Sequence, residues 1–404
     1  MRVGHGARDL EVVPGEGMGG YADRSQGVEG VLDPLEVHVL TFADDAHRFA
    51  LVVADLICVN TDIVDRIRAG LLDLGVDSCW VSATHTHASP EAGCTPGGAA
   101  TPPGLGVRLL EATVAAAKTA LADEQDAALA HTRAWVPKLA GRRNADDTAP
   151  MEIPVDMIVV ADDDVVGVIT ISPVHPTVLP AANRDVSADL NGGIRRSLAT
   201  PHRWAVAVTG AAGDISTRHT RAGRSAAEID RLAAVVASHV QIEAHGEYES
   251  RRNAVRPPVS RTVRLEPKSA ADVDGLPDEP PGAPTDERTR VVYEQGLQLA
   301  RDLAARGRVD DYVVDVQAVG LGEVTLVAVP AELFLALGES IRAATGPDVI
   351  VLGYTNGYLG YLPSRDTLPT YETLVSPVRP GSGERIADAA VRAVQAVRRS
   401  EERE

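Results

Sequence analysis

The chain has 404 residues, of which 44 % are hydrophobic and 24 % are charged, so it can bury a substantial core. At roughly 150 residues per domain, this length allows two or three domains or one large α/β domain. The net charge of −18 disfavours binding to nucleic-acid phosphates and to anionic lipid headgroups. The aromatic content of 3 % disfavours a surface that stacks on bases.

The cysteines and the N-terminus bear on the compartment. Cys58, Cys79 and Cys94 lack CxxC spacing, and we expect them to be reduced and mostly buried. The first residues, MRVGHGARDLEVVPGEG, contain no apolar stretch of a secretory signal, and no apolar run approaches the ~20 residues of a membrane span. We therefore expect a cytoplasmic protein without stable membrane insertion, although export by a twin-arginine or unusual route stays open.

Apolar, β-branched runs alternate with amphipathic patterns along the whole chain, which predicts the α/β class. The expected strands, several of them apolar on both faces, are Val37–Phe42, Phe49–Asp55, Cys79–Ala83, Met157–Ala161, Val165–Ser172, Trp204–Thr209, Val313–Val319, Val324–Val329 and Val349–Gly353. The expected helices, with apolar residues at helical spacing, are Ile63–Leu74, Leu105–Ala122, Ala226–His239, Arg288–Ala305, Leu333–Ala344 and Glu384–Val397. We predict a single α/β domain over residues 1–404, with mixed sheet layers flanked by helices. Segment 266–289, rich in Pro, Asp and Glu, is expected to be an exposed loop.

Two histidines, His85 and His87, directly follow an apolar strand in VSATHTHASP. Because residues i and i+2 of an extended chain point the same way, this strand end presents both imidazoles to one pocket. Two surface histidines in a loop are the alternative, but the buried strand favours an active site. His175 also follows a strand, and the next residue is a proline that holds it extended. It is either a structural histidine or a third member of an imidazole cluster.

Three further strand ends carry polar residues. The turn AVTGAAGDISTR contains Asp214 and Ser216, but it lacks the lysine and spacing of a phosphate-binding loop. Glu332 lies at a helix start, where it either favours the helix dipole or ligates a metal. The segment VLGYTNGYLGYLPSRD holds three of the eight tyrosines, which indicates either a packed turn or a site. These three are Tyr354, Tyr358 and Tyr361.

Taken in order, these segments resemble the neutral ceramidases, zinc-dependent amidases that cleave N-acyl sphingosine in lipid metabolism. The matching segments are GMGGYADR, THTH, HPT after a strand, SADLNGG, GAAGDIS, the strand-end Glu332 and TNGYLGYLPS. Each motif is weak alone, but together they follow the family order from about Gly15 to about Tyr371. The resemblance covers nearly the whole chain.

The resemblance implies a zinc site and a substrate site. The zinc ligands it implies are His85, His175, Glu332 and Tyr361. The residues it places against the substrate carbonyl are His87, Tyr371 and an arginine of LAGRRN, for which we take Arg142 rather than Arg143. Ser216 matches a serine that is a nucleophile or positions the substrate. Gly19 and Gly20 are expected to line the substrate site, as is Asp214 unless it only fixes its turn.

This donor set suits Zn²⁺ and leaves an open position for water, whose pKa zinc lowers to ~7. The function that the resemblance implies is zinc-dependent hydrolysis of a linear N-acyl amide, either ceramide-like or a soluble metabolite. One alternative is reverse or transfer acyl chemistry on a small metabolite, such as amide or lactam formation or ester cleavage. A non-catalytic metal-binding protein is the other.

The chain departs from the family in ways that weaken ceramide as the substrate. Thr217 and Arg218 follow the GDxS match in place of Pro-Asn, and the segment before Tyr371 is shorter. We expect no C-terminal immunoglobulin-like domain. Low aromatic content disfavours a long-chain lipid pocket. The acyl group, the direction of the reaction and the oligomeric state do not follow from the sequence.

Overall fold

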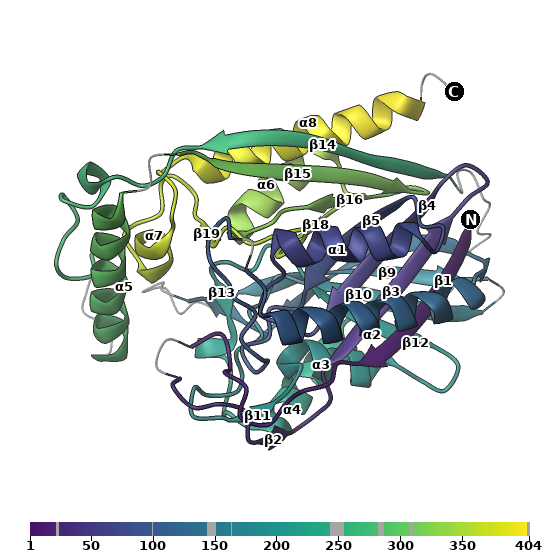
Figure 1. Cartoon of the computed structure of the whole chain (residues 1–404), viewed down its shortest axis with the longest axis horizontal. Helices are drawn as coiled ribbons and strands as arrows, with labels where there is room; N and C mark the ends of the chain where they lie inside the picture. The colour runs from purple at the N-terminus through teal and green to yellow at the C-terminus, as the bar shows by residue number, and fades with distance from the viewer. Residues whose placement is uncertain are drawn as a thin grey trace.

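The computed structural model describes residues 1–21, 24–98, 100–143, 151–162, 164–242, 254–281, 287–307 and 310–401 (Figure 1). Most strands lie in three sheets. The first sheet, in the order β5-β4-β3-β1-β6, consists of β1 (Arg2–Asp9), β3 (Glu36–Ala43), β4 (Arg48–Ala54), β5 (Ser78–Ala83) and β6 (Gln125–Asp126). The second, in the order β12-β10-β9-β7, consists of β7 (Ala128–Pro137), β9 (Glu152–Ala161), β10 (Val165–Ser172) and β12 (Trp204–Thr209). The third, in the order β14-β15-β16-β18, consists of β14 (Val255–Leu265), β15 (Tyr312–Leu321), β16 (Val324–Ala328) and β18 (Val349–Leu352).

Short pairs and helices complete the fold. The two-stranded pairs are β2 (Gly30–Val31) with β11 (Asp185–Val186), β8 (Gly141–Arg142) with β13 (Ile215–Ser216), and β17 (Glu332–Leu333) with β19 (Tyr361–Leu362). The helices are α1 (Thr61–Leu72), α2 (Pro103–Ala122), α3 (Asp189–Leu198), α4 (Ala226–Ala237), α5 (Glu287–Arg306), α6 (Leu335–Thr345), α7 (Tyr371–Val375) and α8 (Ser382–Glu401). Two 3-10 turns span Thr217–His219 and Ala270–Asp272.

All three sheets contribute to one central apolar core, with side chains such as Phe42 from the first, Val206 from the second and Leu326 from the third. Helices cover the outer faces: α1 and α2 pack on the first sheet, and α6 and α8 on the third (Figure 1). The α/β class with mixed sheet layers flanked by helices is therefore confirmed. Among the described residues, no helix has the length and apolarity that a bilayer span requires.

All nine expected strands and six expected helices are present, but β1, β7, β14, α3, α7 and the strands of two residues were missed. Strand β1 contains glycines because α2 crosses it closely, and a Cβ at Gly4 would lie 2.0 Å from the Ala120 carbonyl oxygen. Strand β14 contains two prolines, Pro257 and Pro258, where its register against β15 shifts. Of segment 266–289, the described part up to residue 281 is mostly exposed, and α5 begins at Glu287.

The expectation of three reduced cysteines is wrong for two of them. Cys58 and Cys94 form a disulfide with their Cα atoms 6.1 Å apart, whereas Cys79 is free and buried. The two partners lie 36 positions apart in sequence, and only the folded chain brings them together. Because disulfides persist mainly in oxidising compartments, this bond argues against the expected cytoplasmic location.

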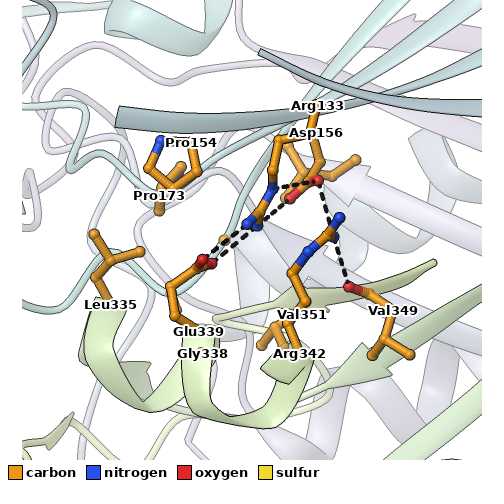
Figure 2. Close-up of a pocket in the computed structure, with 13 residues that line it drawn as sticks. Arg133, Pro154, Asp156, Pro173, Leu335, Gly338, Glu339, Arg342, Val349 and Val351 are labelled. Atoms are coloured by element: carbon orange, nitrogen blue, oxygen red, sulfur yellow. Dashed lines mark hydrogen bonds and ion pairs between the residues drawn. The ribbon is translucent and has the colours of Figure 1, made fainter. Parts of the chain in front are cut away.

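A partly buried ion network attaches α6 to the second sheet (Figure 2). The Arg133 guanidinium on β7 donates to Asp156 on β9, with its Nε 2.9 Å from Oδ1, and to Glu339 on α6, with its Nη1 2.8 Å from Oε2. Arg342 on α6 donates to the same Asp156 carboxylate. The cavity among these residues is ≈ 20 Å³, about the space of one water molecule. This network therefore holds α6 against the second sheet, and α6 begins three residues after Glu332.

Candidate metal centre

The predicted site residues meet where parallel strands end. His85 follows β5, His175 follows β10, and Glu332 follows β16. Each of these strands runs parallel to a neighbour, β4, β12 and β18 respectively. Carboxyl ends of parallel strands are the usual place for a site in an α/β protein. The three sheets thus bring residues from distant parts of the chain into one cluster.

The nitrogen and oxygen atoms of this cluster converge. The Nε2 atoms of His85 and His175 lie 3.2 Å apart, and His87 Nε2 lies 3.3 Å from His85 Nε2. One ligand atom from each of the three histidines falls within 4.8 Å of the others. Glu332 Oε2 is 3.0 Å from His175 Nε2 and 3.3 Å from His85 Nε2. All four side chains are buried.

The hydrogen bonds of two imidazoles fix which nitrogen carries the proton. Nδ1 of His85 lies 2.6 Å from the Ile57 carbonyl oxygen, and Nδ1 of His175 lies 2.6 Å from the Ala212 carbonyl oxygen. Because a carbonyl only accepts, both Nδ1 atoms donate, so in a neutral ring the Nε2 atom presents a lone pair. Burial lowers the pKa of His175 to about 4, which keeps that ring neutral. Two lone pairs and a carboxylate oxygen that face one another fit a bound cation.

The backbone at His85 does not have the extended conformation that the sequence analysis expected. Its φ is +62°, in the left-handed region, so the chain is not extended there. Its backbone N–H donates to the Leu56 carbonyl, and its ring stacks on Tyr354 with centroids 4.0 Å apart. His85 and His87 still meet, but edge to face rather than side by side. The adjacency was predicted, and its geometric reason was wrong.

The arginine at the cluster is Arg143, which corrects the choice of Arg142. Arg143 Nη1 lies 3.1 Å from His175 Nε2 and 3.1 Å from the Tyr361 hydroxyl. Its Nε forms an ion pair with Glu372 at 3.2 Å, and these carboxylate and phenol neighbours raise its pKa despite burial. Arg142 is exposed on β8, where it pairs with Ile215. The sequence placed two arginines side by side and gave no signal to separate them.

Three tyrosines lie at or next to the cluster, and each has a different contact. Tyr361, opposite Glu332 in the β17–β19 pair, stacks on His175 with centroids 6.2 Å apart and accepts from Arg143. Tyr371 begins α7, and its ring lies edge-on to Tyr361 at 6.3 Å. The phenol that donates to Glu332 is that of Tyr358, at 2.7 Å from Oε1. The tyrosine-rich turn had pointed to Tyr358, but no role was assigned to it.

One glycine of GMGGYADR, Gly20, lies against His87. Gly20 has a φ of +99°, and a Cβ there would lie 2.6 Å from His87 Cγ. The Tyr21 ring lies edge-on to His87 at 5.0 Å. Among the described residues, His87 Nδ1 is buried without a hydrogen-bond partner. Gly20 therefore lies against His87, whereas a Cβ at Gly19 would lie 3.0 Å from Ile57 Cγ2, and the role of both glycines in lining a substrate site stays a prediction. Ala22 and Asp23 of the motif lie outside the described residues.

The turn after β12 contains Asp214 and Ser216 and contacts the start of α6. Asp214 Oδ1 accepts from the Leu335 backbone N–H at 2.8 Å, which ties this turn to the start of α6. Burial raises the pKa of Asp214. Ser216 is buried, and its Oγ accepts from the Arg218 N–H and so caps a 3-10 turn. These bonds match the turn-fixing alternative for Asp214 and leave the role of Ser216 a prediction.

No protein-family model matches the sequence, and no curated protein sequence matches it either. Solved structures do resemble the fold. The structure of a ceramidase complexed with C2 matches with a TM-score of 0.73 and 18 % identity, over 99 % of this chain and 75 % of that one. Neutral ceramidase from Pseudomonas aeruginosa matches with a TM-score of 0.70 and 18 % identity, over 98 % and 74 %. The chain therefore has the neutral ceramidase fold over nearly its whole length, as its ordered motifs predicted.

Proposed function

We propose that the chain is a zinc-dependent amidohydrolase that cleaves a linear N-acyl amide, either ceramide-like or a soluble N-acyl metabolite. The observation that carries this proposal is the convergence of the His85 and His175 Nε2 atoms on the Glu332 carboxylate, with all three side chains buried. A structural role for the cluster does not account for His87, Arg143 and Tyr371 beside it, since a structural zinc has four protein ligands and needs no further donors.

Zinc would be held by His85, His175 and Glu332, with Tyr361 as the fourth protein ligand. When bound, zinc polarises a carbonyl group and activates water at neutral pH. The carbonyls of Ile57 and Ala212 hold the two imidazoles in the orientation that binding requires.

The remaining residues act on the substrate. During hydrolysis, water adds to the amide carbonyl carbon, negative charge develops on the carbonyl oxygen, and the C–N bond then breaks. Arg143, held by Glu372, directs a guanidinium into the cluster, where it can stabilise that charge together with Tyr371. Burial and the neighbouring histidines hold the pKa of His87 well below its usual value, so its ring is neutral and can accept the proton that the attacking water releases and then pass that proton to the departing amine.

The first test is a panel of N-acyl amides that ranges from acetylated polar amines to long-chain ceramides. Each is assayed with the purified protein, after removal of metal by a chelator, and after addition of zinc. We expect hydrolysis that is lost with the metal and restored by zinc. Zinc binding without turnover of any amide would favour the non-catalytic alternative, and amide synthesis or ester cleavage would favour the transfer alternative.

A further inference from the structure

The two oxygens of the Glu332 carboxylate have different partners. Oε2 faces the imidazoles, at 3.0 Å from His175 Nε2 and 3.3 Å from His85 Nε2. Oε1 accepts a hydrogen bond of 2.7 Å from the Tyr358 hydroxyl. The terminal torsion of a glutamate side chain is broad, so the two oxygens exchange places easily unless something distinguishes them. Tyr358 is the hydroxyl that makes this distinction.

The backbone of Tyr358 is itself held in place. Its carbonyl oxygen accepts from the Gly97 N–H at 2.9 Å, and the Leu359 N–H donates to the Pro330 carbonyl at 2.8 Å. Pro330 lies two residues before Glu332, so these bonds fix the tyrosine to the segment that carries the carboxylate.

Tyr358 also lines a cavity of ≈ 210 Å³, together with residues of α1, the loop at Gly97 and Gly98, and strand β15. This space is large enough for several water molecules. The same residue thus borders the cavity and donates its hydroxyl to the buried Glu332 carboxylate.

We propose that Tyr358 is a positioning residue that holds Oε1 of Glu332 away from the metal and leaves Oε2 as the oxygen directed at it. This inference rests on the proposed function only in taking Glu332 as a metal ligand. Hydrogen bonds to a metal-ligating carboxylate typically change metal affinity 10- to 100-fold when they are removed. Tyr358 is thus assigned a role distinct from that of Tyr361, three residues later on the same turn.

The test compares Tyr358→Phe with Tyr354→Phe in the full chain. Both changes remove one hydroxyl and keep the ring. The Tyr354 hydroxyl is buried without a hydrogen-bond partner among the described residues, so it is a matched control. Zinc affinity is measured by competition with a chromogenic chelator, and the coordination is monitored by the visible absorption bands of the Co²⁺-substituted protein. We expect Tyr358→Phe to weaken zinc binding about 10- to 100-fold and to shift the Co²⁺ bands, whereas Tyr354→Phe changes neither.

A double-mutant cycle separates positioning from a general effect on folding. In the Glu332→Gln background, Tyr358→Phe is expected to change zinc affinity less than about twofold, because the carboxylate it positions is gone. An equal loss in both backgrounds would overturn the proposal, as would wild-type zinc affinity and unshifted Co²⁺ bands in Tyr358→Phe. A wild-type protein that binds zinc but cleaves no amide would overturn the proposed function and leave this comparison valid. A wild-type protein that binds no zinc or Co²⁺ would overturn both.

Discussion

The Nε2 atoms of His85 and His175 lie 3.2 Å apart, and each ring donates from its Nδ1 to a backbone carbonyl at 2.6 Å. Arg143 Nη1 lies 3.1 Å from His175 Nε2 and so brings a positive charge to this pair of acceptors. Folding thus brings together two buried imidazole nitrogens that can bind a cation, from residues 90 positions apart in the sequence. The predictions below follow from this arrangement.

The histidines should separate into ligands and a non-ligand. We expect His85→Ala and His175→Ala to lose zinc and activity together. His87→Ala should retain zinc and lose about 10²- to 10⁴-fold in kcat, the usual contribution of a general acid or base. Zinc content by elemental analysis and kcat on the best amide measure both. Loss of zinc from His87→Ala would place His87 among the ligands, which its distance of 3.3 Å from His85 Nε2 makes the alternative.

The two adjacent arginines provide a matched pair. Arg143→Gln removes a guanidinium that contacts His175 and Tyr361, and we expect kcat to fall about 10²- to 10³-fold, the effect of one lost oxyanion donor. Arg142→Gln changes an exposed side chain and should alter kcat less than about twofold. Steady-state kinetics of both variants measure these changes, and a larger loss of kcat in Arg142→Gln than in Arg143→Gln would reverse the assignment.

Gly20→Ala should disturb His87 without touching the proposed ligands. The added Cβ would lie 2.6 Å from His87 Cγ at a residue whose φ is +99°. We expect a stability loss of about 1–3 kcal/mol together with a lower kcat and unchanged zinc content. The control is Gly17→Ala in the same segment, where the nearest atom lies 3.7 Å away and φ is not positive. Chemical denaturation and kinetics of the pair test this, and equal effects in both variants would exclude a specific contact with His87.

Ser216 distinguishes water attack from a covalent acyl-enzyme. Its Oγ already accepts from the Arg218 N–H, so we expect Ser216→Ala to lose stability by about 1 kcal/mol and to retain part of its kcat. A covalent mechanism allows no such residual activity. Mass spectrometry of the protein quenched during turnover provides the independent readout, and an acyl group on Ser216 would refute direct attack by water.

The disulfide should stabilise the loop next to the cluster. Cys58 follows Ile57, whose carbonyl accepts from His85, and Cys94 lies in the connection between β5 and α2 that also carries His87. For partners 36 positions apart, the chain-entropy estimate is about 4 kcal/mol. We expect the Cys58→Ala/Cys94→Ala double variant to unfold at correspondingly lower denaturant, and Cys79→Ala, a control that leaves this bond intact, to do so to a smaller extent. A double variant with wild-type stability would contradict the pairing.

Sequence patterns predicted the parts of this protein that depend on local order. The strands before His85, His175 and Glu332 are rich in apolar residues, which made them recognisable, and polar residues follow their ends. The ordered motifs then predicted the fold that the solved structures confirm.

Features that depend on contacts between distant segments could not be predicted from the sequence in the same way. Nothing local distinguishes Arg143 from Arg142, and the left-handed φ of His85 depends on bonds to the segment before α1. The Cys58–Cys94 pair requires the loop after His87 to fold back on that same segment. The bond from Tyr358 to Glu332 joins two turns whose proximity is set by the pairing of β17 with β19.

The central claim is that His85, His175 and Glu332 form a hydrolytic zinc centre. The most direct measurement is zinc per chain by elemental analysis, made on the same preparation in which hydrolysis of the amide panel is followed, with His175→Ala beside the wild type. The account predicts about one zinc per wild-type chain with amide hydrolysis, and neither zinc nor hydrolysis in the variant. Wild-type protein prepared without chelators that contains no zinc, or that hydrolyses amides equally well in the variant, would contradict it.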